Sequence, residues 1–276
     1  MIRDITIGQY YQTDSVIHRL DPRLKIIATL IYIISIFIFT NPYVYLFATL
    51  FLIFVVAASK VPVGFMMRGL KAVFTLLLIT VVFNMFLIPG DPLVTFWKLS
   101  ISREGLTTAI LMAYRLIILI LGSSVMTLTT TPNQLTDGLE SVMKPLKVFK
   151  MTVHEVAMMM SIALRFIPIL MEETDKIIKA QTARGASFDD KNIIKKAKSL
   201  VPILVPLFIS AFRRANDLAM AMEARCYRGG EGRTKMKPLK YQKRDFMGYI
   251  VMLVYLAGII LLGIYAKNLP FGDIIK

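Results

Sequence analysis

Two arginines end a short repeat and are the residues best suited to bind a partner. Arg184 ends the segment AQTAR at 180–184, and Arg225 ends the segment AMEAR at 221–225, so both follow the pattern A-x-x-A-R. A guanidinium can bind a carboxylate through two parallel hydrogen bonds, which suits docking into an acidic groove of another protein. Alternatively, each arginine only compensates the negative end of a helix dipole. The repeat by itself leaves both interpretations open.

Catalytic and metal-binding chemistry has few candidates in this sequence. Cys226 is the only cysteine, which excludes a disulfide framework and a cysteine-cluster zinc site. The two histidines, His18 and His154, have no second histidine or carboxylate at ligand spacing, so we expect no metal site. An intramembrane enzyme would need His154 together with Glu172 and Glu173, which lie about 27 Å further along one helix. The phosphate-binding pattern G-x-x-x-x-G-K-[ST] is absent, so any ATP hydrolysis must come from partner proteins.

The composition indicates a membrane protein. Of the 276 residues, 56% are hydrophobic and 18% are charged, whereas soluble domains average about 45–50% apolar and about 25% charged residues. The net charge is +15, from 33 Lys and Arg against 18 Asp and Glu. Such an excess requires an acidic partner, which can be nucleic acid, anionic lipid or an acidic protein surface. Together these values indicate a membrane protein with a large cytoplasmic part.

The apolar segments predict an all-α integral membrane protein with about five transmembrane helices. A span needs roughly 20 mostly apolar residues, with a lower limit near 17. Lys and Arg alternate between the connections, which predicts a cytoplasmic N-terminus and a C-terminus outside the cell membrane. The predicted spans are residues 24–40, 43–59, 72–88, 106–128 and 246–266.

Arg115 falls near the middle of the fourth predicted span. A charge at that depth costs at least about 2.5–3.5 kcal/mol. We therefore expect Arg115 to face a partner, a water-filled cleft or the interface rather than lipid. Alternatively, the span is shorter and Arg115 reaches one membrane surface.

The spans divide the chain into three parts. Residues 1–128 are predicted to form an N-terminal membrane domain, residues 129–245 a cytoplasmic coupling domain, and residues 246–276 a C-terminal transmembrane helix. The basic residues between Arg225 and Arg244 lead into this last span, and we expect them to contact anionic lipid headgroups. Because they lie against spans rather than on a soluble module, we do not expect nucleic-acid binding.

Two long helices are predicted within the coupling domain, after a short helix at 133–143. Apolar residues at spacings of three and four favour a first long helix from about Val153 to Gly185, where the glycine is a natural stop. A second runs from about Asp190 to Tyr227. At 1.5 Å per residue each is roughly 45–55 Å long, which is long enough to carry a movement to a separate protein. Bends are expected at Pro168, Pro202 and Pro206.

The order of the motifs resembles a known family. Ala183-Arg184-Gly185 and Ala224-Arg225-Cys226 lie about 40 residues apart, after four apolar segments and before a last one. They are similar to the paired Ala-Arg-Gly-type motifs of EcfT, the transmembrane T component of energy-coupling factor (ECF) transporters, in the CbiQ/EcfT family. The segment HRLDPRLK at 18–25 resembles the opening motif of that family, and AMAMEAR at 219–225 resembles the block around its second signature. Cys226 departs from the usual glycine, so a glycine-type helix stop is not predicted there.

The resemblance implies a scaffold and not an enzyme. A T component has no ATPase and no substrate pocket of its own. It joins two ABC ATPase subunits, EcfA and EcfA′, to a small membrane-embedded S component that binds a vitamin or another micronutrient. ATP and Mg are used by the partner subunits, and no cofactor is bound by the T component itself. Its two long cytoplasmic helices cross and act as coupling helices.

The resemblance also implies roles for particular residues. Arg184 and Arg225 contact the ATPases, and their immediate setting is formed by Ala183, Gly185, Ala224 and Cys226. An apolar methionine-rich surface contacts the S component, because methionine side chains repack easily. Alternatively, these methionines fill the core of the coupling domain. They are Met158, Met159, Met160, Met220 and Met222.

Two other classes of function stay open from the residues. A solute-binding permease of a conventional ABC importer, or of a cobalt or nickel importer, needs polar groups within its spans. Arg115 with Asn84 is a thin set for that purpose. The intramembrane enzyme depends on the widely separated His154 and glutamate pair.

Overall fold

A computed structural model describes residues 9–39, 41–88, 92–96, 99–145, 152–186, 193–229, 236 and 238–265. The chain forms two units. The unit that we call the membrane unit comprises residues 8–142 and 239–276. The other, which we call the helix-pair unit, comprises residues 1–7 and 143–238.

The described residues are mostly helical. The membrane unit contains α1 (Pro22–Ile38), α2 (Pro42–Ser59), α3 (Val63–Leu87), β1 (Pro92–Phe96), β2 (Leu99–Ser102), α4 (Arg103–Thr129), α5 (Pro132–Met143) and α8 (Lys243–Tyr265). The helix-pair unit contains α6 (Val153–Ala183) and α7 (Ile193–Ala224).

Helices begin where the sequence supplies an N-terminal cap. The Asp21 carboxylate accepts a hydrogen bond from the Arg23 N–H at 2.8 Å, and Pro22 takes the first helical position of α1. At α5, Thr131 and Gln134 bond reciprocally at 3.3 Å, each side chain to the main-chain N–H of the other. Both caps depend only on residues that are at most three positions apart in the sequence.

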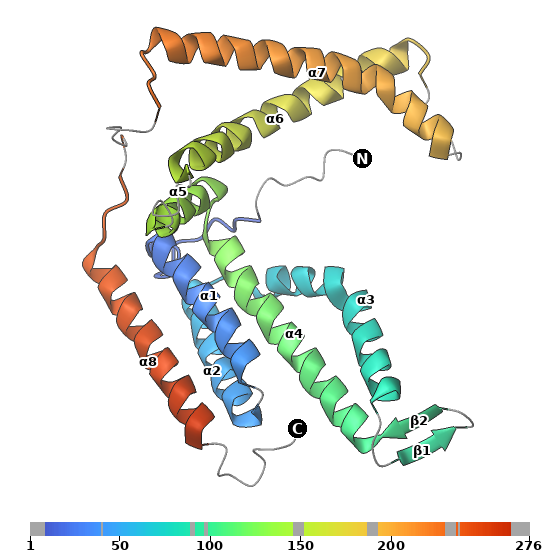
Figure 1. Cartoon of the computed structure of the whole chain (residues 1–276), viewed down its shortest axis with the longest axis vertical. Helices are drawn as coiled ribbons and strands as arrows, with labels where there is room; N and C mark the ends of the chain where they lie inside the picture. The colour runs from blue at the N-terminus through green and yellow to red at the C-terminus, as the bar shows by residue number, and fades with distance from the viewer. Residues whose placement is uncertain are drawn as a thin grey trace. The chain divides into compact units, whose positions relative to one another are not determined.

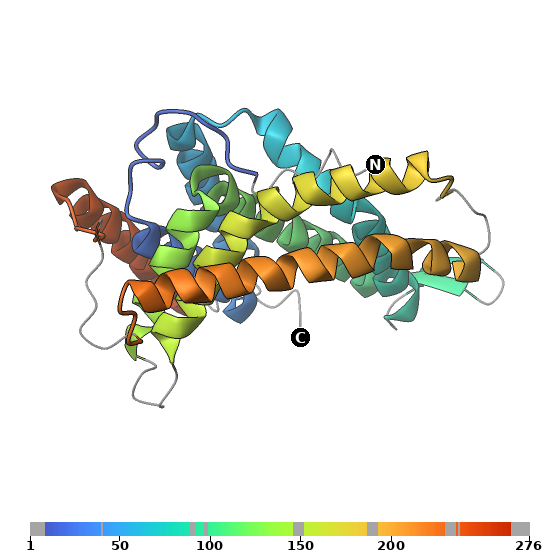
Figure 2. The same cartoon turned by 90° about the horizontal axis from the view of Figure 1, so that it is seen from above.

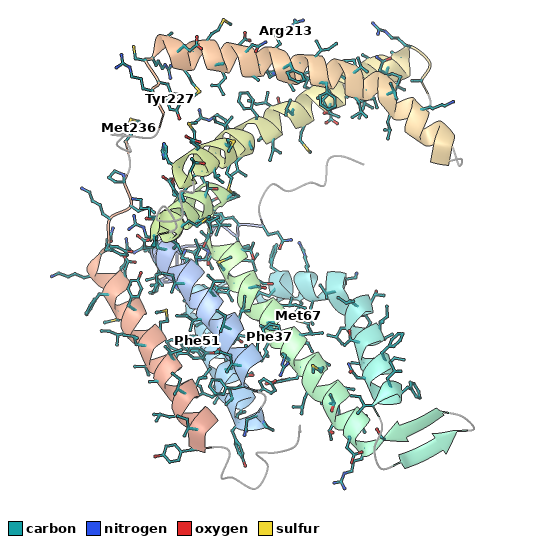
Figure 3. The ribbon with its side chains drawn as sticks, in the orientation of Figure 1. Phe37, Phe51, Met67, Arg213, Tyr227 and Met236 are labelled. Carbon is teal, nitrogen blue, oxygen red and sulfur yellow. The ribbon has the colours of Figure 1, made fainter. Side chains whose placement is uncertain are left out.

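The core of the membrane unit lies among α1, α2, α4 and α8, which lie side by side (Figure 1). Tyr255 of α8 is buried there. Its hydroxyl lies 2.9 Å from the Ser35 hydroxyl of α1. Its ring stacks on Phe51 of α2, which is labelled in Figure 3, with 4.2 Å between the ring centres. These contacts fasten α8 to helices more than 200 residues earlier in the chain.

Within the described residues, four helices are long and apolar enough to cross a membrane, namely α2, α4, α6 and α8. A fifth is α3, if the two parts that meet at its bend after Lys71 form one span. The prediction of an all-α integral membrane protein with about five spans is thus confirmed, although the set differs from the predicted one. With 17 residues α1 is at the lower limit for a span, whereas α6 qualifies because its first half is almost uncharged.

A small hairpin connects α3 to α4 and was not predicted. β1 and β2 pair antiparallel, with Val94 opposite Ile101 and Phe96 opposite Leu99. The sequence analysis predicted only a connection between the spans at 72–88 and 106–128, with no strands in it. Strands of five and four residues carry too short an alternation to be recognised from one sequence.

The helix α5 belongs to the membrane unit. A Cβ on Gly138 would lie 2.9 Å from the Pro22 side chain and 3.0 Å from that of Ile26, so α5 and α1 approach closely there. The chain passes from one unit to the other between residues 142 and 143 and between residues 238 and 239. The placement of residues 129–245 in the cytoplasm stays a prediction.

The helix-pair unit consists of two long helices that run in roughly opposite directions and cross each other at an angle (Figures 1 and 2). Both continue through their internal prolines, Pro168 in α6 and Pro202 and Pro206 in α7. The description of α7 starts at Ile193, and the predicted start of the second helix near residue 190 lies outside the described residues. The two C-terminal ends, which carry Arg184 and Arg225, therefore point away from each other along the pair.

Candidate functional site

The end of α6 has the geometry of a Schellman motif. The N–H of Gly185 donates to the Thr182 carbonyl at 3.0 Å, and the N–H of Ala186 donates to the Gln181 carbonyl at 3.0 Å. Gly185 has φ of +88°, a left-handed conformation that glycine adopts without steric cost. Arg184 is thereby held at the C-cap, as the first residue beyond the last helical position. This confirms the predicted glycine stop.

The end of α7 has the same geometry although a cysteine takes the place of the glycine. The N–H of Cys226 donates to the Glu223 carbonyl at 2.8 Å, and the N–H of Tyr227 donates to the Met222 carbonyl at 3.1 Å. Cys226 has φ of +55°, so it adopts the left-handed conformation at a cost of roughly 1–2 kcal/mol. A glycine-type stop was not predicted at Cys226, and this expectation is corrected. The helix ends there in the same motif, because the hydrogen bonds of the motif compensate the cost of the left-handed conformation.

Arg184 and Arg225 therefore occupy equivalent positions at two equivalent helix ends. Both residues are exposed, as are their neighbours Ala183, Gly185, Ala224 and Cys226. Each arginine directly follows the last alanine of its A-x-x-A-R repeat. The repeat thus places two guanidinium groups in solvent at the two ends of the helix pair.

An ion pair between α6 and α7 lies equally far, in residues, from Arg184 on α6 and from Arg225 on α7. The Glu173 carboxylate of α6 accepts hydrogen bonds from Arg214 of α7, at 2.8 Å from Nη2 and 3.1 Å from Nε. It also accepts a hydrogen bond from the Ser210 hydroxyl. Arg184 lies eleven residues after Glu173, and Arg225 lies eleven residues after Arg214. Each guanidinium is therefore about 16 Å along its helix from the contact.

A groove of about 530 Å³ lies between the first half of α6 and the end of α7. Among the described residues its charged lining consists of arginines, without a carboxylate. Such a groove suits an acidic partner segment that also has apolar side chains. The arginines are Arg165, Arg225 and Arg228, and the apolar and aromatic part is formed by Met158, Ile162, Leu218, Met222 and Tyr227.

The five predicted methionines differ in their exposure. Met158 and Met222 are half-buried in this groove, next to Arg225. The other three, Met159, Met160 and Met220, are exposed. None of the five is fully buried, which disfavours the alternative that they fill a core of the helix pair.

In the membrane unit, Arg115 faces a protein side chain. Its Nε–H donates to the Tyr45 hydroxyl at 2.8 Å, and Nη2 donates to the same oxygen. The guanidinium carbon lies 5.9 Å from the centre of the Phe37 ring. The amide of the other polar candidate, Asn84, donates to the Thr80 carbonyl of its own helix. Among the described residues, Arg115 and Asn84 share no hydrogen bond.

The segment 18–25 fastens the start of α1 to the start of α8. The buried Asp245 carboxylate accepts hydrogen bonds from the Asp21 N–H at 2.8 Å and from the Gln242 N–H at 2.7 Å. The Arg23 guanidinium lies over the Tyr241 ring, 4.9 Å from its centre. Asp245 and Tyr241 were missed by the sequence analysis, because they are more than 200 residues away from their partners.

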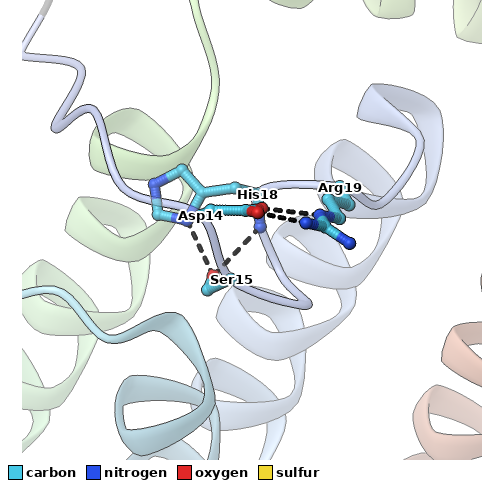
Figure 4. A network of polar contacts seen from close by, with 4 residues as sticks. All are labelled: Asp14, Ser15, His18 and Arg19. Carbon is cyan, nitrogen blue, oxygen red and sulfur yellow. Dashed lines mark hydrogen bonds and ion pairs between the residues drawn. The ribbon is translucent and has the colours of Figure 1, made fainter.

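A second polar cluster precedes α1 (Figure 4). Nε2 of His18 donates to the Tyr11 carbonyl at 3.0 Å, and in the neutral ring Nδ1 accepts from the Ser15 hydroxyl at 2.7 Å. Burial lowers the pKa of His18 below its ordinary value. Asp14 pairs with Arg19, and this hydrogen bond lowers the pKa of the Asp14 carboxyl. The cluster orders the chain just ahead of the first helix.

Comparisons with known proteins identify relatives over most of this chain. Residues 13–236 match the family CbiQ, described as cobalt transport protein. This range includes segment 18–25 and both arginine motifs. A protein of Clostridium kluyveri named energy-coupling factor transporter transmembrane protein EcfT is 56% identical over 256 residues, which cover 92% of this chain and 95% of that protein. Proteins of the same name from Ruminiclostridium cellulolyticum and Streptococcus thermophilus are 52% and 46% identical, and cover 95% and 90% of this chain.

The chain belongs to the CbiQ/EcfT family. The resemblance inferred from the paired motifs is confirmed, and so is the prediction of a multi-pass membrane protein of a transport system. The matched range contains α6, α7 and the Glu173–Arg214 contact, whereas Tyr241 and Asp245 of the junction with α1 lie beyond it.

Proposed function

We propose that this protein is the transmembrane coupling subunit of an ECF-type importer. It joins two ABC ATPase subunits to a membrane-embedded S component and itself catalyses no reaction. The observation that carries the proposal is the pair of equivalent helix ends, each of which holds one exposed arginine at a C-cap. Two equivalent docking ends fit two ATPase subunits, and family membership supports this assignment.

Each arginine is proposed to enter an acidic groove of one ATPase, EcfA or EcfA′. A guanidinium at a fixed backbone position loses little freedom on docking, and it can bind a carboxylate through two hydrogen bonds. ATP and Mg bind to these partners. When the ATPases move together, they displace the two ends of the helix pair, and the Glu173–Arg214 contact transfers force from one helix to the other.

The exposed methionines, Met159, Met160 and Met220, are proposed as part of the surface for the S component. Their flexible side chains suit a surface that moves against its partner or that serves several partners. The transported solute is a vitamin or another micronutrient held by the S component.

The N-terminus and the helix-pair unit are proposed to lie in the cytoplasm, with the C-terminus outside. The distribution of Lys and Arg supports this orientation. Although α6 is apolar enough to cross a membrane, it packs along α7, which does not qualify as a span among the described residues. Its second half also carries Glu172, Glu173, Asp175 and Lys176 in five residues, and such a cluster is costly in hydrocarbon.

A cobalt importer is the second candidate, because the family that matches is described as cobalt transport protein. In that case the helix ends keep their role and only the solute-binding partner changes. A permease with a solute site of its own has less support, since Arg115 is engaged by Tyr45 and Asn84 by its own helix.

Purification of the native complex tests the proposal. We expect two ATPases and one small membrane protein to accompany the chain, and the isolated chain to hydrolyse no ATP and to bind neither vitamins nor Co²⁺ tightly. Reproducible binding of a vitamin or of Co²⁺ by the isolated chain would instead support the permease.

A further inference from the structure

An apolar cavity of about 310 Å³ lies in the membrane unit among α1, α2, α4 and α8. Small residues at Ala28, Ala58, Gly122 and Gly248 line it, one from each of the four helices. Larger apolar side chains complete the wall, among them Phe51, Leu52, Val55 and Val125. The volume falls at the lower end of the range of about 300–1,000 Å³ that is typical of ligand pockets.

The charged groups of the cavity lie at one end. Lys25 lies in the first turn of α1 and Arg244 in the first turn of α8. From there the lining continues to Tyr32 on α1, seven residues after Lys25, and to Met252 on α8, eight residues after Arg244. The cavity therefore extends about 10 Å along both helices from a basic end into an apolar interior.

Lys25 is a buried cation whose two hydrogen bonds go to neutral groups. Its ammonium donates to the Thr129 carbonyl at 2.8 Å and to the His18 carbonyl at 3.2 Å. An ammonium has three donors. The carboxylates of Asp21 and Asp245 lie near enough to act electrostatically on Lys25, but among the described residues neither of them lines the cavity. Arg244, which is exposed, adds a second positive charge at the same end of the cavity.

We propose that this cavity binds one anionic phospholipid. An acyl chain occupies the apolar part, and the phosphate lies near Lys25 and Arg244, in the leaflet where α1 and α8 begin. A polar solute fits less well, because it needs several convergent polar groups along the cavity, whereas here the charge is confined to one end. The proposal concerns the membrane unit alone and does not depend on the coupling function proposed above.

The acyl-chain site can be tested with a matched pair of substitutions on α2. Ala58 lines the cavity, whereas the adjacent Ala57 is exposed and does not line it. The full-length protein is purified in detergent, incubated with an equal mixture of phosphatidylglycerol and phosphatidylcholine, and examined by native mass spectrometry. We expect the wild type and A57W to retain one phosphatidylglycerol, and A58W to retain it at a level lower by about tenfold or more. Equal retention by A57W and A58W would overturn the proposal.

The headgroup end has its own matched pair, which does not disturb the core. Arg244 lines the cavity, whereas the adjacent, exposed Lys243 does not. We expect R244Q to reduce the preference for phosphatidylglycerol over phosphatidylcholine by about fivefold, the factor for one basic residue at an anionic surface, and K243Q to leave it unchanged. Equal preference in both variants, or retention of either lipid without preference by the wild type, would contradict the proposed site even if A58W failed to fold.

Discussion

Glu173 of α6 and Arg214 of α7 form a two-bonded ion pair from which each helix runs eleven residues to its terminal arginine. Among the described residues this is the ion pair that joins the two helices, and it lies at the same number of residues from both proposed docking ends. A displacement of either end therefore acts on the contact with the same lever arm. The ion pair is therefore well placed to transmit a displacement of either helix end to the other helix.

The first prediction concerns this contact. Because the ion pair is partly exposed, its coupling energy in a double-mutant cycle of E173Q and R214Q should be about 0.5–1 kcal/mol. Thermal unfolding of the purified protein measures it. S210A serves as the control, since it removes one neutral donor and keeps the ion pair. Additive effects of E173Q and R214Q would show that the contact does not join the helices.

The second prediction concerns the two helix ends. Cys226 bears a side chain in the left-handed conformation, so C226G should stabilise the protein by about 1 kcal/mol, whereas G185A should destabilise it by about the same amount. Equilibrium unfolding of both variants measures the two changes. Effects of the same sign would contradict the equivalence of the two ends.

The third prediction concerns the junction of α1 and α8. Asp245 is buried and accepts hydrogen bonds from two main-chain N–H groups. D245N replaces one accepting oxygen by a donor, and we expect it to lower the free energy of unfolding by about 1–3 kcal/mol. D217N, at an exposed position of α7, is the control and should change it by less than about 0.5 kcal/mol. Equal effects of D245N and D217N would refute the role of the junction.

The fourth prediction is a pH dependence of the cluster before α1. Because burial lowers the pKa of His18 from its ordinary 6.5, the stabilising contribution of neutral His18 is complete above pH 6.5 and is lost as the pH falls through the lowered value. The lowered pKa of Asp14 acts in the same direction, but only below its ordinary 3.8. Between pH 7 and pH 5 the change should therefore come from His18.

Hydrogen exchange of residues 11–19, corrected for the intrinsic pH dependence, measures this change. We expect protection to decrease between pH 7 and pH 5 in the wild type and to be independent of pH in H18Q. The corresponding variant of the other histidine, H154Q, should behave as the wild type. A pH-dependent loss that persists in H18Q would assign the effect to another group.

Local signals in the sequence predicted much of this structure. The Asp21–Pro22 start of α1 and the glycine stop after Arg184 depend on a few adjacent residues, so they can be recognised in a single sequence. The same holds for the long apolar runs of α2, α4 and α8. The paired arginine motifs identified the family because their order relative to the spans was intact.

Features that depend on distant partners could not be predicted. Asp245 and Asp21 are 224 residues apart in the sequence, and the residues around Asp245 do not indicate that Asp21 is its partner. The selection of Arg214 rather than Arg213 as the partner of Glu173 depends on which face of α7 lies against α6. The left-handed Cys226 was not predicted because cysteine has no preference for that conformation.

Co-purification of the ATPases with charge-reversed variants tests the central claim most directly. We expect R184E and R225E each to lose one ATPase, and the double variant to lose both while it still inserts into the membrane. R213E, an exposed position on α7 outside the motif (Figure 3), should retain both. Retention of both ATPases by the double variant at the wild-type ratio would contradict the docking role of Arg184 and Arg225.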